Sequence, residues 1–132
     1  MRAPTRTALV ERLSEFDPVV EIGVGRRPAV ASGLADQDVD VTATDIRSQR
    51  LPAGVDFVRD DVREPTRALY EGAQALYALN LPPELHGPVA ALADRIDSAF
   101  LFTTLGSEQP TVSVTRETVP GDTLFVYDAQ RA

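Results

Sequence analysis

The most constraining feature of this sequence is a mainly apolar run, Val19 to Ile22, that stops at two closely spaced glycines, Gly23 and Gly25. A run of this length suits a buried strand, and glycine after it permits a tight turn and a close approach of the backbone to a ligand. Pro28 follows, and proline is favoured in the first turn of a helix. The segment therefore predicts a strand, a tight turn and a helix, which together open a parallel βαβ unit.

Strand-like and helical patterns alternate along the rest of the chain. Helical spacing or a helix-opening proline is found at 5–16, 28–34, 65–70 and 83–96. Strand patterns occupy 39–46, 55–62, 73–79 and 98–104, although the alanines and leucines of 73–79 also suit a helix. We expect Pro88 to disturb the first turns of the last helix. Two alternating runs flank Pro120-Gly121-Asp122 and predict a hairpin. The fold class is therefore α/β: a Rossmann-like, mostly parallel, doubly wound sheet with a C-terminal antiparallel hairpin.

Composition limits the class of protein. The 132 residues fit one domain, 1–132, and the absence of cysteine excludes disulfides, cysteine-ligated metals and a thiol nucleophile. No apolar stretch approaches the ~20 residues that span a bilayer, and the first residues do not form a secretory signal. We therefore expect a cytoplasmic protein with no membrane partner. No basic stripe with interleaved aromatic residues indicates nucleic acid.

The types and numbers of charged residues are unusual. All 13 basic residues are arginine, acidic residues number 20, and the net charge is −7. One interpretation is an acidic surface for a cationic partner. The other is adaptation to the salty cytosol of a halophile, where surface carboxylates keep a protein hydrated and salt screens their repulsion. The absence of lysine favours the halophilic interpretation.

Acidic residues end three of the predicted strands. Glu21 lies in the first, Asp45 ends the second, and Asp60 and Asp61 end the third. Ligands of open α/β sheets bind outside the carboxyl ends of the strands, and a carboxylate at the end of the second strand typically accepts hydrogen bonds from ribose hydroxyls. Two other interpretations remain open at this point: a tight turn without a ligand, and ordinary solvated loop acids in an acidic protein.

Several motifs resemble a known fold family. The segments "VVEIGVG", Asp45 after the second strand, and "RDDV" after the third resemble motifs I, II and III of the class I S-adenosylmethionine (SAM)-dependent methyltransferase fold. The combination of "VEIGVGR", "TDI", "RDDV" and "YEGAQALYALNLPPELH" in so short a chain resembles a small uncharacterised archaeal (UPF-type) protein family built on that fold. This resemblance implies the fold but no established reaction.

The resemblance implies SAM as the ligand and gives roles to the glycine loop. Gly23 and Gly25 would let the backbone pass beside the methionyl and ribose parts of SAM, and Glu21 would help to hold its amino group. Arg27 replaces the third glycine of a dinucleotide loop, which argues against NAD because that glycine allows the helix to approach a pyrophosphate. Arg26 or Arg27 would pair with the carboxylate of SAM, or both would simply be solvated at the helix start.

The resemblance also implies an adenosine site. Asp45 would accept hydrogen bonds from the ribose hydroxyls, Asp61 from the adenine amine, and Val62 would pack on the base. Asp61 is preferred over Asp60 because the usual pattern puts the acidic residue directly before a small apolar one.

The segment "ALNLPPELH" suggests an acceptor region at Asn80, Pro82 and Pro83. Amino-group methyltransferases of this fold carry Asn/Asp-Pro-Pro-aromatic here, whereas this chain inserts Leu81 and lacks the aromatic residue. A rigid proline turn into a helix is the favoured alternative. His86, the single histidine, cannot form a histidine-cluster metal site, so no metal is expected. We interpret it as a solvated loop residue, although it lies near enough to carry a proton.

Two functions are therefore expected. The first is a SAM-binding protein that acts as a minimal SAM-dependent methyltransferase, whose acceptor the sequence does not name. The short chain leaves little room to bind an acceptor, so a second subunit, in a homo- or hetero-oligomer, is one way to complete that site. The alternative is a non-catalytic Rossmann-like module that binds a nucleoside or supports a partner. A nicotinamide-dependent oxidoreductase is disfavoured because of Arg27.

Overall fold

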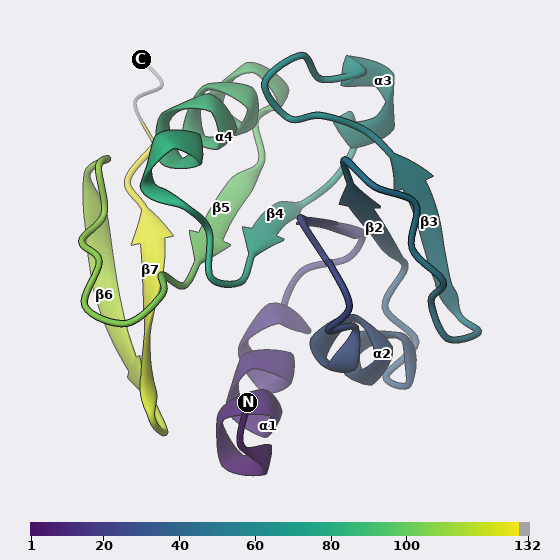
Figure 1. Ribbon diagram of the computed structural model, residues 1–132, viewed down its shortest axis with the longest axis horizontal. Helices are drawn as coiled ribbons and strands as arrows, with labels where there is room; N and C mark the ends of the chain where they lie inside the picture. Colours follow the sequence, from purple (N-terminus) through teal and green to yellow (C-terminus); the bar gives the residue numbers. More distant parts are fainter. Residues whose placement is uncertain (130–132) are drawn as a thin grey trace.

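The structure, a computed structural model, describes residues 1–129 and contains a seven-stranded sheet in the order β3-β2-β1-β4-β5-β7-β6 (Figure 1). The strands are β1 (Val19–Ile22), β2 (Val41–Asp45), β3 (Val55–Arg59), β4 (Ala75–Ala78), β5 (Ala99–Phe102), β6 (Val114–Val119) and β7 (Asp122–Tyr127). The first five strands pair in parallel, and β7 pairs antiparallel with both β5 and β6. The predicted α/β class with a mostly parallel sheet and an antiparallel hairpin is confirmed.

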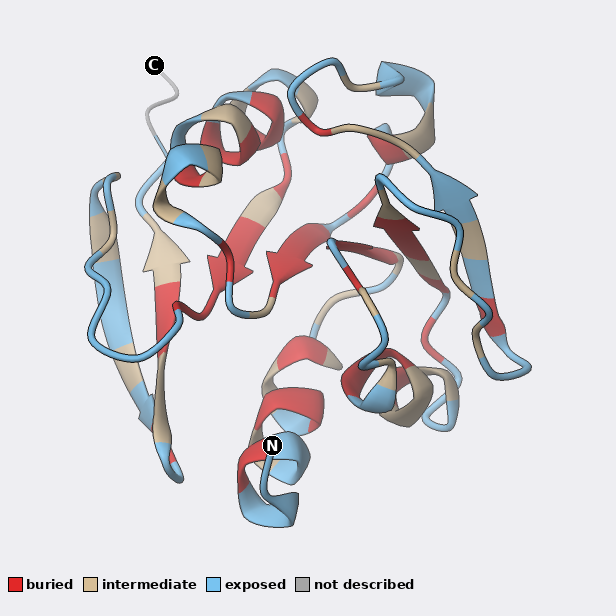
Figure 2. Ribbon diagram, in the orientation of Figure 1, coloured by how far each residue is buried: buried red, intermediate tan, exposed pale blue. Residues whose placement is uncertain are grey.

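Helices cover both faces of the sheet. The helices α1 (Ala3–Leu13) and α2 (Ala29–Ala35) lie on one face, and α3 (Arg67–Tyr70) and α4 (Pro83–Ile96) lie on the other (Figure 1). Each pair packs on its own hydrophobic cluster, one containing Leu9, Leu13 and Leu34 and the other containing Tyr70 and Leu92. Figure 2 shows these buried positions on the inward sides of the helices and along the central strands. The sheet is therefore doubly wound.

The order of the strands places a crevice at the centre of the sheet. From β1 the chain proceeds to β2 and β3 on one side, and it then returns to β4 and β5 on the other side of β1. Helices on opposite faces therefore diverge between β1 and β4, and this switch point is where open α/β sheets bind ligands. All residues of β1 and β4 are buried, which holds the crevice on rigid elements.

The predicted strand at 73–79, whose residues also suited a helix, is confirmed as β4. Local details of the helices differ from the sequence prediction. Helix α4 is continuous through Pro88, so the predicted disturbance of its first turns is wrong. Gly87 precedes Pro88, and it lacks the Cβ that normally clashes with the proline ring in a helix. Helix α1 begins and ends earlier than predicted, with Pro4 in its first turn. None of the helices within residues 1–129 has the length and apolarity to cross a bilayer.

Candidate functional site

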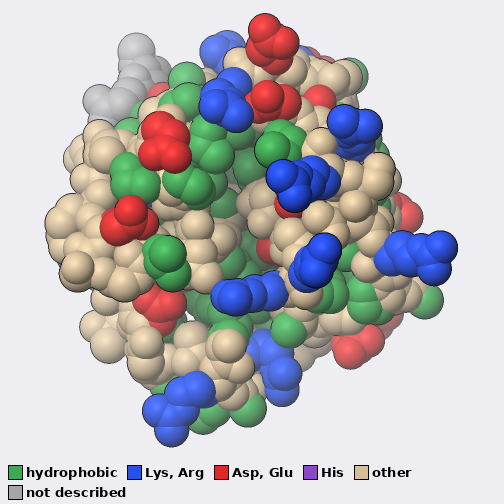
Figure 3. All heavy atoms as spheres, in the orientation of Figure 1, with side chains coloured by type: hydrophobic (Ala, Val, Ile, Leu, Met, Phe, Trp, Pro, Cys, Tyr) green, Lys and Arg blue, Asp and Glu red, His purple; other side chains and the backbone are tan. Residues whose placement is uncertain are grey.

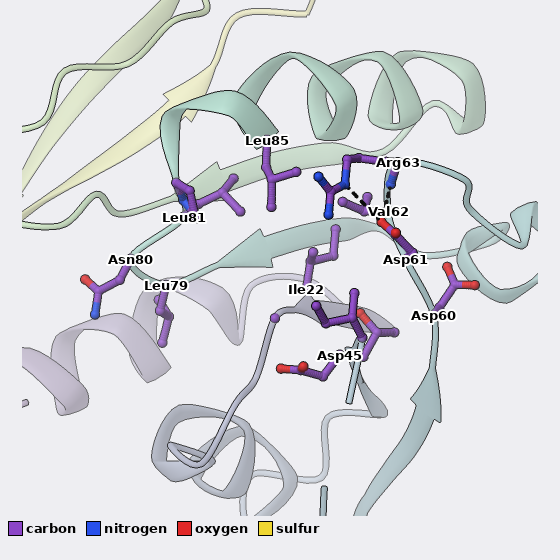
Figure 4. A pocket seen from close by; sticks show the side chains of 14 residues that line it. Ile22, Asp45, Asp60, Asp61, Val62, Arg63, Leu79, Asn80, Leu81 and Leu85 are labelled. Carbon is purple, nitrogen blue, oxygen red and sulfur yellow. Dashed lines mark hydrogen bonds and ion pairs between the residues drawn. The ribbon is translucent and has the colours of Figure 1, made fainter. Parts of the chain in front are cut away.

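Two cavities open at the carboxyl ends of the parallel strands. The smaller one, here called the strand-end pocket, has a volume of about 240 Å³ (Figure 4). Its walls include Gly23, Asp45, Ile46, Asp61, Val62 and Leu85. The larger one, here called the arginine cleft, has a volume of about 900 Å³. Its walls include Arg2, Glu21, Gly25, Arg26, Arg27 and Asp122. The two cavities share Gly23, Leu79 and Asn80, so they are neighbouring parts of one region.

Asp45 is fixed by backbone donors. The amide of Gly25 donates to Asp45 Oδ2 at 2.7 Å, and the amide of Arg47 donates to Asp45 Oδ1 at 3.1 Å. Gly25 can make this bond because its φ is +55°, in the left-handed region that favours glycine. Gly23 has a φ of +73°, and an added Cβ at either glycine would meet no atom within 4 Å. The loop therefore leaves open space beside a carboxylate that is already oriented.

Glu21 lies on the floor of the arginine cleft. Its neighbour in the sheet register is Tyr77 of β4, whose hydroxyl donates to Glu21 Oε1 at 2.7 Å. Burial raises the pKa of Glu21 to about 7, the Tyr77 hydrogen bond opposes this rise, and the nearby Asp45 adds to it. Burial and the neighbouring Glu21 also raise the pKa of Tyr77 well above its ordinary value. The floor of the cleft therefore carries a carboxyl group that changes its charge near neutral pH.

The two acids after β3 have different partners. Asp60 Oδ2 accepts a hydrogen bond of 2.6 Å from the hydroxyl of Tyr70, which is completely buried. Asp61 Oδ1 accepts a hydrogen bond of 2.9 Å from the amide of Arg63, and the Arg63 guanidinium lies 3.4 Å away (Figure 4). The Arg63 amide holds the pKa of Asp61 below its usual value. Both acids line the strand-end pocket and are half-buried, but Asp60 is bonded to the buried Tyr70, whereas Asp61 is bonded only to the exposed Arg63.

Only part of the segment 80–83, which follows β4, lines the two cavities. Asn80 borders both cavities, and its backbone is in the left-handed conformation with a φ of +53°. Its backbone amide donates to Thr103 Oγ1 at 2.9 Å. Pro82 lines the strand-end pocket. Pro83 begins α4 and is not among the residues that line either cavity.

His86 is not the solvated loop residue that the sequence suggested. It lies in α4 and is fully buried, with its ring 4.6 Å from that of Phe102. Its Nδ1 accepts from the amide of Thr111 at 3.2 Å, and Nε2 therefore donates to the carbonyl oxygen of Leu81 at 2.9 Å. The prediction is wrong because α4 begins at Pro83 and turns His86 toward the sheet. With both ring nitrogens occupied, His86 fixes the structure and is not placed to carry a proton.

The structure groups the residues that the sequence singled out. Gly23, Asp45, Asp61, Val62, Asn80 and Pro82 line the strand-end pocket, whereas Glu21 and Gly25 line the adjoining cleft together with Gly23 and Asn80. Sequence reasoning gave no role to Ile46, which directly follows Asp45 at the strand end and is 52% exposed at the pocket. Sequence reasoning missed Arg2, which the packing of α1 against the β6–β7 hairpin brings to the cleft. Within residues 1–129, no group of three or more His, Asp or Glu side chains is arranged to hold a metal ion.

Solved structures of methyltransferases share this fold. An RNA methyltransferase from Salinibacter ruber in complex with S-adenosyl-L-homocysteine (SAH) is 13% identical, with a TM-score of 0.68 over 98% of this chain and 92% of that one. The magnesium protoporphyrin IX methyltransferase ChlM from Synechocystis PCC 6803 with bound SAM is 12% identical, with a TM-score of 0.65 over 97% of this chain and 78% of that one. Similarity at these identities shows the fold, which is the Rossmann-like fold of class I SAM-dependent methyltransferases.

Sequence comparison gives the family. The model of an uncharacterised protein family, UPF0146, matches residues 5–130. A UPF0146 protein of Halobacterium salinarum is 47% identical over 127 residues, which are 96% of this chain and 97% of that one. A UPF0146 protein of Archaeoglobus fulgidus is 40% identical over 84 residues, which are 64% of this chain and 65% of that one. The resemblance to an archaeal family is confirmed, and the Halobacterium relative fits a halophilic origin. This chain belongs to the uncharacterised protein family UPF0146 and has the fold of class I SAM-dependent methyltransferases.

Proposed function

We propose that this chain, as one class I methyltransferase-like domain over residues 1–132, binds SAM across the two cavities at its strand ends. The observation that carries the proposal is the grouping of Asp45, Asp61 and Val62, from the ends of two neighbouring strands, in one pocket beside the glycine loop. A pocket with apolar walls and a few oriented polar groups is the usual form of a small-molecule site.

The strand-end pocket fits an adenosine. Two backbone amides orient the Asp45 carboxylate, and its remaining lone pairs are suited to accept hydrogen bonds from two ribose hydroxyls. Ile46 and Val62 offer apolar surface for the adenine ring, and the exposed Ile46 would be covered by it. Asp61 Oδ2, which accepts no hydrogen bond within residues 1–129, is the acceptor for the adenine amine, since Asp61 Oδ1 already bonds Arg63 and Asp60 already bonds Tyr70.

The glycine loop and Glu21 fit the methionyl part. The space beside Gly23 and Gly25 lets a ligand contact the backbone directly, and an ammonium group near Glu21 would favour its charged form. NAD fits less well, because Arg27 stands where a dinucleotide loop has its third glycine.

We further propose a minimal methyltransferase with its acceptor region at Asn80 and Pro82, next to Pro83. When bound, SAM supplies an electrophilic methyl group, so the protein's task is chiefly to orient the acceptor. Asn80 is suited to this because it borders both cavities and its backbone is fixed by Thr103. The fixed conformation costs free energy in a residue other than glycine, and such conformations are concentrated at functional sites.

One observation favours the alternative, a non-catalytic nucleoside-binding or partner-supporting module. Leu81 separates Asn80 from Pro82 and is buried, with its amide bonded to the carbonyl oxygen of Thr103 at 2.9 Å. The chain thus departs from the Asn-Pro-Pro arrangement that grips a target nitrogen. In this case a partner subunit would complete the site or use it as a scaffold.

Calorimetric titration with SAM, SAH and NAD tests the proposal. We expect SAM and SAH to bind and NAD not to bind. A wild-type protein that binds no SAM at millimolar ligand would refute the SAM site. If SAM binds, transfer of a labelled methyl group to components of a cell extract distinguishes the methyltransferase from the non-catalytic module, which would bind SAM and transfer nothing.

A further inference from the structure

The arginine cleft contains cationic side chains that have no partner among the described residues. Arg2, Arg26 and Arg27 line it, and all three are exposed. Within residues 1–129 none of their guanidinium groups forms an ion pair or a hydrogen bond, whereas Arg12, Arg63 and Arg67 are each paired with a carboxylate. Figure 3 shows several basic side chains around the hollow in the middle of this face.

What distinguishes these three arginines is that they line one cleft, since exposed arginines outside it, such as Arg50 and Arg95, are also unpaired within residues 1–129. The local charge of the cleft differs from the net charge of −7 of the whole chain. The acids of the cleft are Glu21 and Asp122, and the pKa of Glu21 is raised to about 7 by burial, so its negative charge is incomplete at neutral pH. The walls of the cleft therefore carry more positive than negative charge.

Bound SAM would increase this excess. SAM has a sulfonium, an ammonium and one carboxylate, so its net charge is positive. Its carboxylate can occupy one guanidinium at most in a bidentate pair, which leaves cationic groups free. The cleft has a volume of about 900 Å³, near the upper end of the range for a site that holds a whole small molecule, whereas the adenosine is assigned to the separate strand-end pocket. The cleft therefore has room for a second small molecule beside the methionyl part of the cofactor.

We propose that the arginine cleft binds a small acceptor molecule through an anionic group, a phosphate or a carboxylate, held by Arg26 and Arg27. The inference rests on the proposed function, since it names the substrate class of the same site. Guanidinium groups form bidentate hydrogen bonds to both kinds of anion and remain charged at any physiological pH. Neighbouring positions 26 and 27 in the loop before α2 place two such groups at one wall of the cleft.

A small anion is favoured over a nucleic acid. A polynucleotide needs basic residues along an extended track, because most of its binding free energy comes from successive phosphates. Of the two cavities at the strand ends, only this cleft is lined by arginines that are unpaired within residues 1–129, and the chain as a whole is acidic. Binding of an oligoribonucleotide is therefore an outcome that would contradict the proposal.

The test uses backbone amide NMR titration of the full chain, saturated with SAH, with inorganic phosphate and malonate as probes. We expect at least one of them to shift the signals of Gly25, Arg26 and Arg27, and the one that binds identifies the anion of the acceptor. The double variant Arg26→Gln/Arg27→Gln should weaken that binding by about tenfold or more, the scale of lost charge-assisted hydrogen bonds.

The matched control is Arg50→Gln/Arg95→Gln. It removes the same charge from two exposed arginines that line neither cavity and have no side-chain partner within residues 1–129. We expect it to bind the anion as the wild type does. Equal weakening in both double variants would mean a general charge effect and would overturn the site, as would unchanged anion binding in Arg26→Gln/Arg27→Gln.

Two further measurements separate the alternatives. If Arg26→Gln/Arg27→Gln loses affinity for SAH but not for methylthioadenosine, which lacks the carboxylate, the arginines serve the cofactor and the proposal is wrong. Tighter binding of a single-stranded oligoribonucleotide as its length increases would also overturn it. If the wild type binds phosphate through Arg26 and Arg27 but binds no SAH, the proposed function fails while the anion site stands.

Discussion

The strand-end pocket and the arginine cleft share Gly23, Leu79 and Asn80, but they hold their polar groups in different ways. In the pocket, Asp45 accepts hydrogen bonds from two backbone amides, and Asp61 accepts one more. The chain itself fixes these groups. In the cleft, the guanidinium groups are exposed and unpaired within the described residues, and the carboxyl group on its floor is buried and poorly solvated.

This difference suits the strand-end pocket and the arginine cleft to two different kinds of ligand. Groups held by backbone donors lose little conformational freedom when a ligand arrives, so they suit a ligand of constant shape. Long, free arginine side chains lose more freedom, and they are suited to ligands recognised mainly by charge. Under the proposed function, the cofactor occupies the fixed region and the acceptor the adaptable one.

The largest effect is expected from Gly25→Val, which tests the fixed region. Valine at a φ of +55° is strained, and its side chain would project into the open space that we assign to the ligand. We expect SAM binding to weaken by about 3 kcal/mol or more, from strain and steric overlap with the ligand, together with displacement of the backbone amide that orients Asp45. Calorimetric titration measures the loss, and circular dichroism verifies the fold.

Gly72→Val is the matched control for Gly25→Val. Gly72 has a φ of +88° and no atom within 4 Å of an added Cβ, and it lines neither cavity. Its substitution should cost similar backbone strain and leave SAM affinity unchanged. Equal losses of affinity at both positions would mean that strain alone explains the result, and the glycine loop would not be a ligand site.

The next largest effect is expected in the pH dependence of the free energy of unfolding, through Glu21 on the floor of the cleft. The pKa of Glu21 is raised from 4.5 to about 7 in the folded protein, so the folded state binds more protons than the unfolded state between these values. The free energy of unfolding should therefore fall as pH rises through this window, by up to about 3 kcal/mol at roughly 1.4 kcal/mol per pKa unit. Urea unfolding of wild type and Glu21→Gln at about pH 5 and about pH 8 gives this difference.

Glu21→Gln sets the reference for that experiment, because an amide keeps an acceptor for Tyr77 without titrating. The variant should show a flatter pH profile than the wild type. Parallel profiles for the two proteins would mean that Glu21 stays ionised in the fold, and the cleft would then carry its full negative charge.

Substitution of Asp45 should have an intermediate effect on binding. Asp45→Ala removes the acceptor for the ribose hydroxyls and should weaken SAM binding by about 1.5–3 kcal/mol, the scale of hydrogen bonds to a charged group. Asp45→Asn keeps one carbonyl oxygen and should cost less. Asp56→Ala, which removes an exposed acid on β3, is the control and should bind as the wild type does. An Asp45→Ala variant with wild-type affinity would exclude a SAM site here.

Local sequence signals predicted the parts of the site that depend on single strands and turns. The run Val19 to Ile22 became β1 with the predicted bounds, and Asp45 ends β2. Gly23 and Gly25 both adopt a positive φ, which is the reason that glycine is needed there. Each of these features follows from residues within a few positions, so the sequence contained enough information.

Features that depend on tertiary packing were not predictable in this way. His86 looked like a polar residue after a proline turn, but the direction of α4 buries it against Phe102. Arg2 lines the cleft only because α1 packs against the β6–β7 hairpin, where Thr5 donates a hydrogen bond to the carbonyl oxygen of Pro120. No pattern in the neighbouring sequence marks contacts between segments so far apart in the chain.

The smallest effects are expected from substitutions of Asp60 and Asp61, which compare two neighbouring acids within the strand-end pocket. Asp61→Ala removes a half-buried acceptor and should weaken SAM binding by about five- to tenfold, the scale of one hydrogen bond, with a smaller change in stability than Asp60→Ala, because its partner Arg63 is exposed to solvent. Asp60→Ala leaves the buried hydroxyl of Tyr70 without its partner and should lower the free energy of unfolding by about 1–2 kcal/mol, with little direct effect on SAM. Calorimetry and urea unfolding of both variants give the two values. If the roles are exchanged, so that Asp60→Ala loses SAM and Asp61→Ala does not, the adenine amine is bound by the acid that also holds Tyr70, and the division between a core-bound and a ligand-bound carboxylate is wrong.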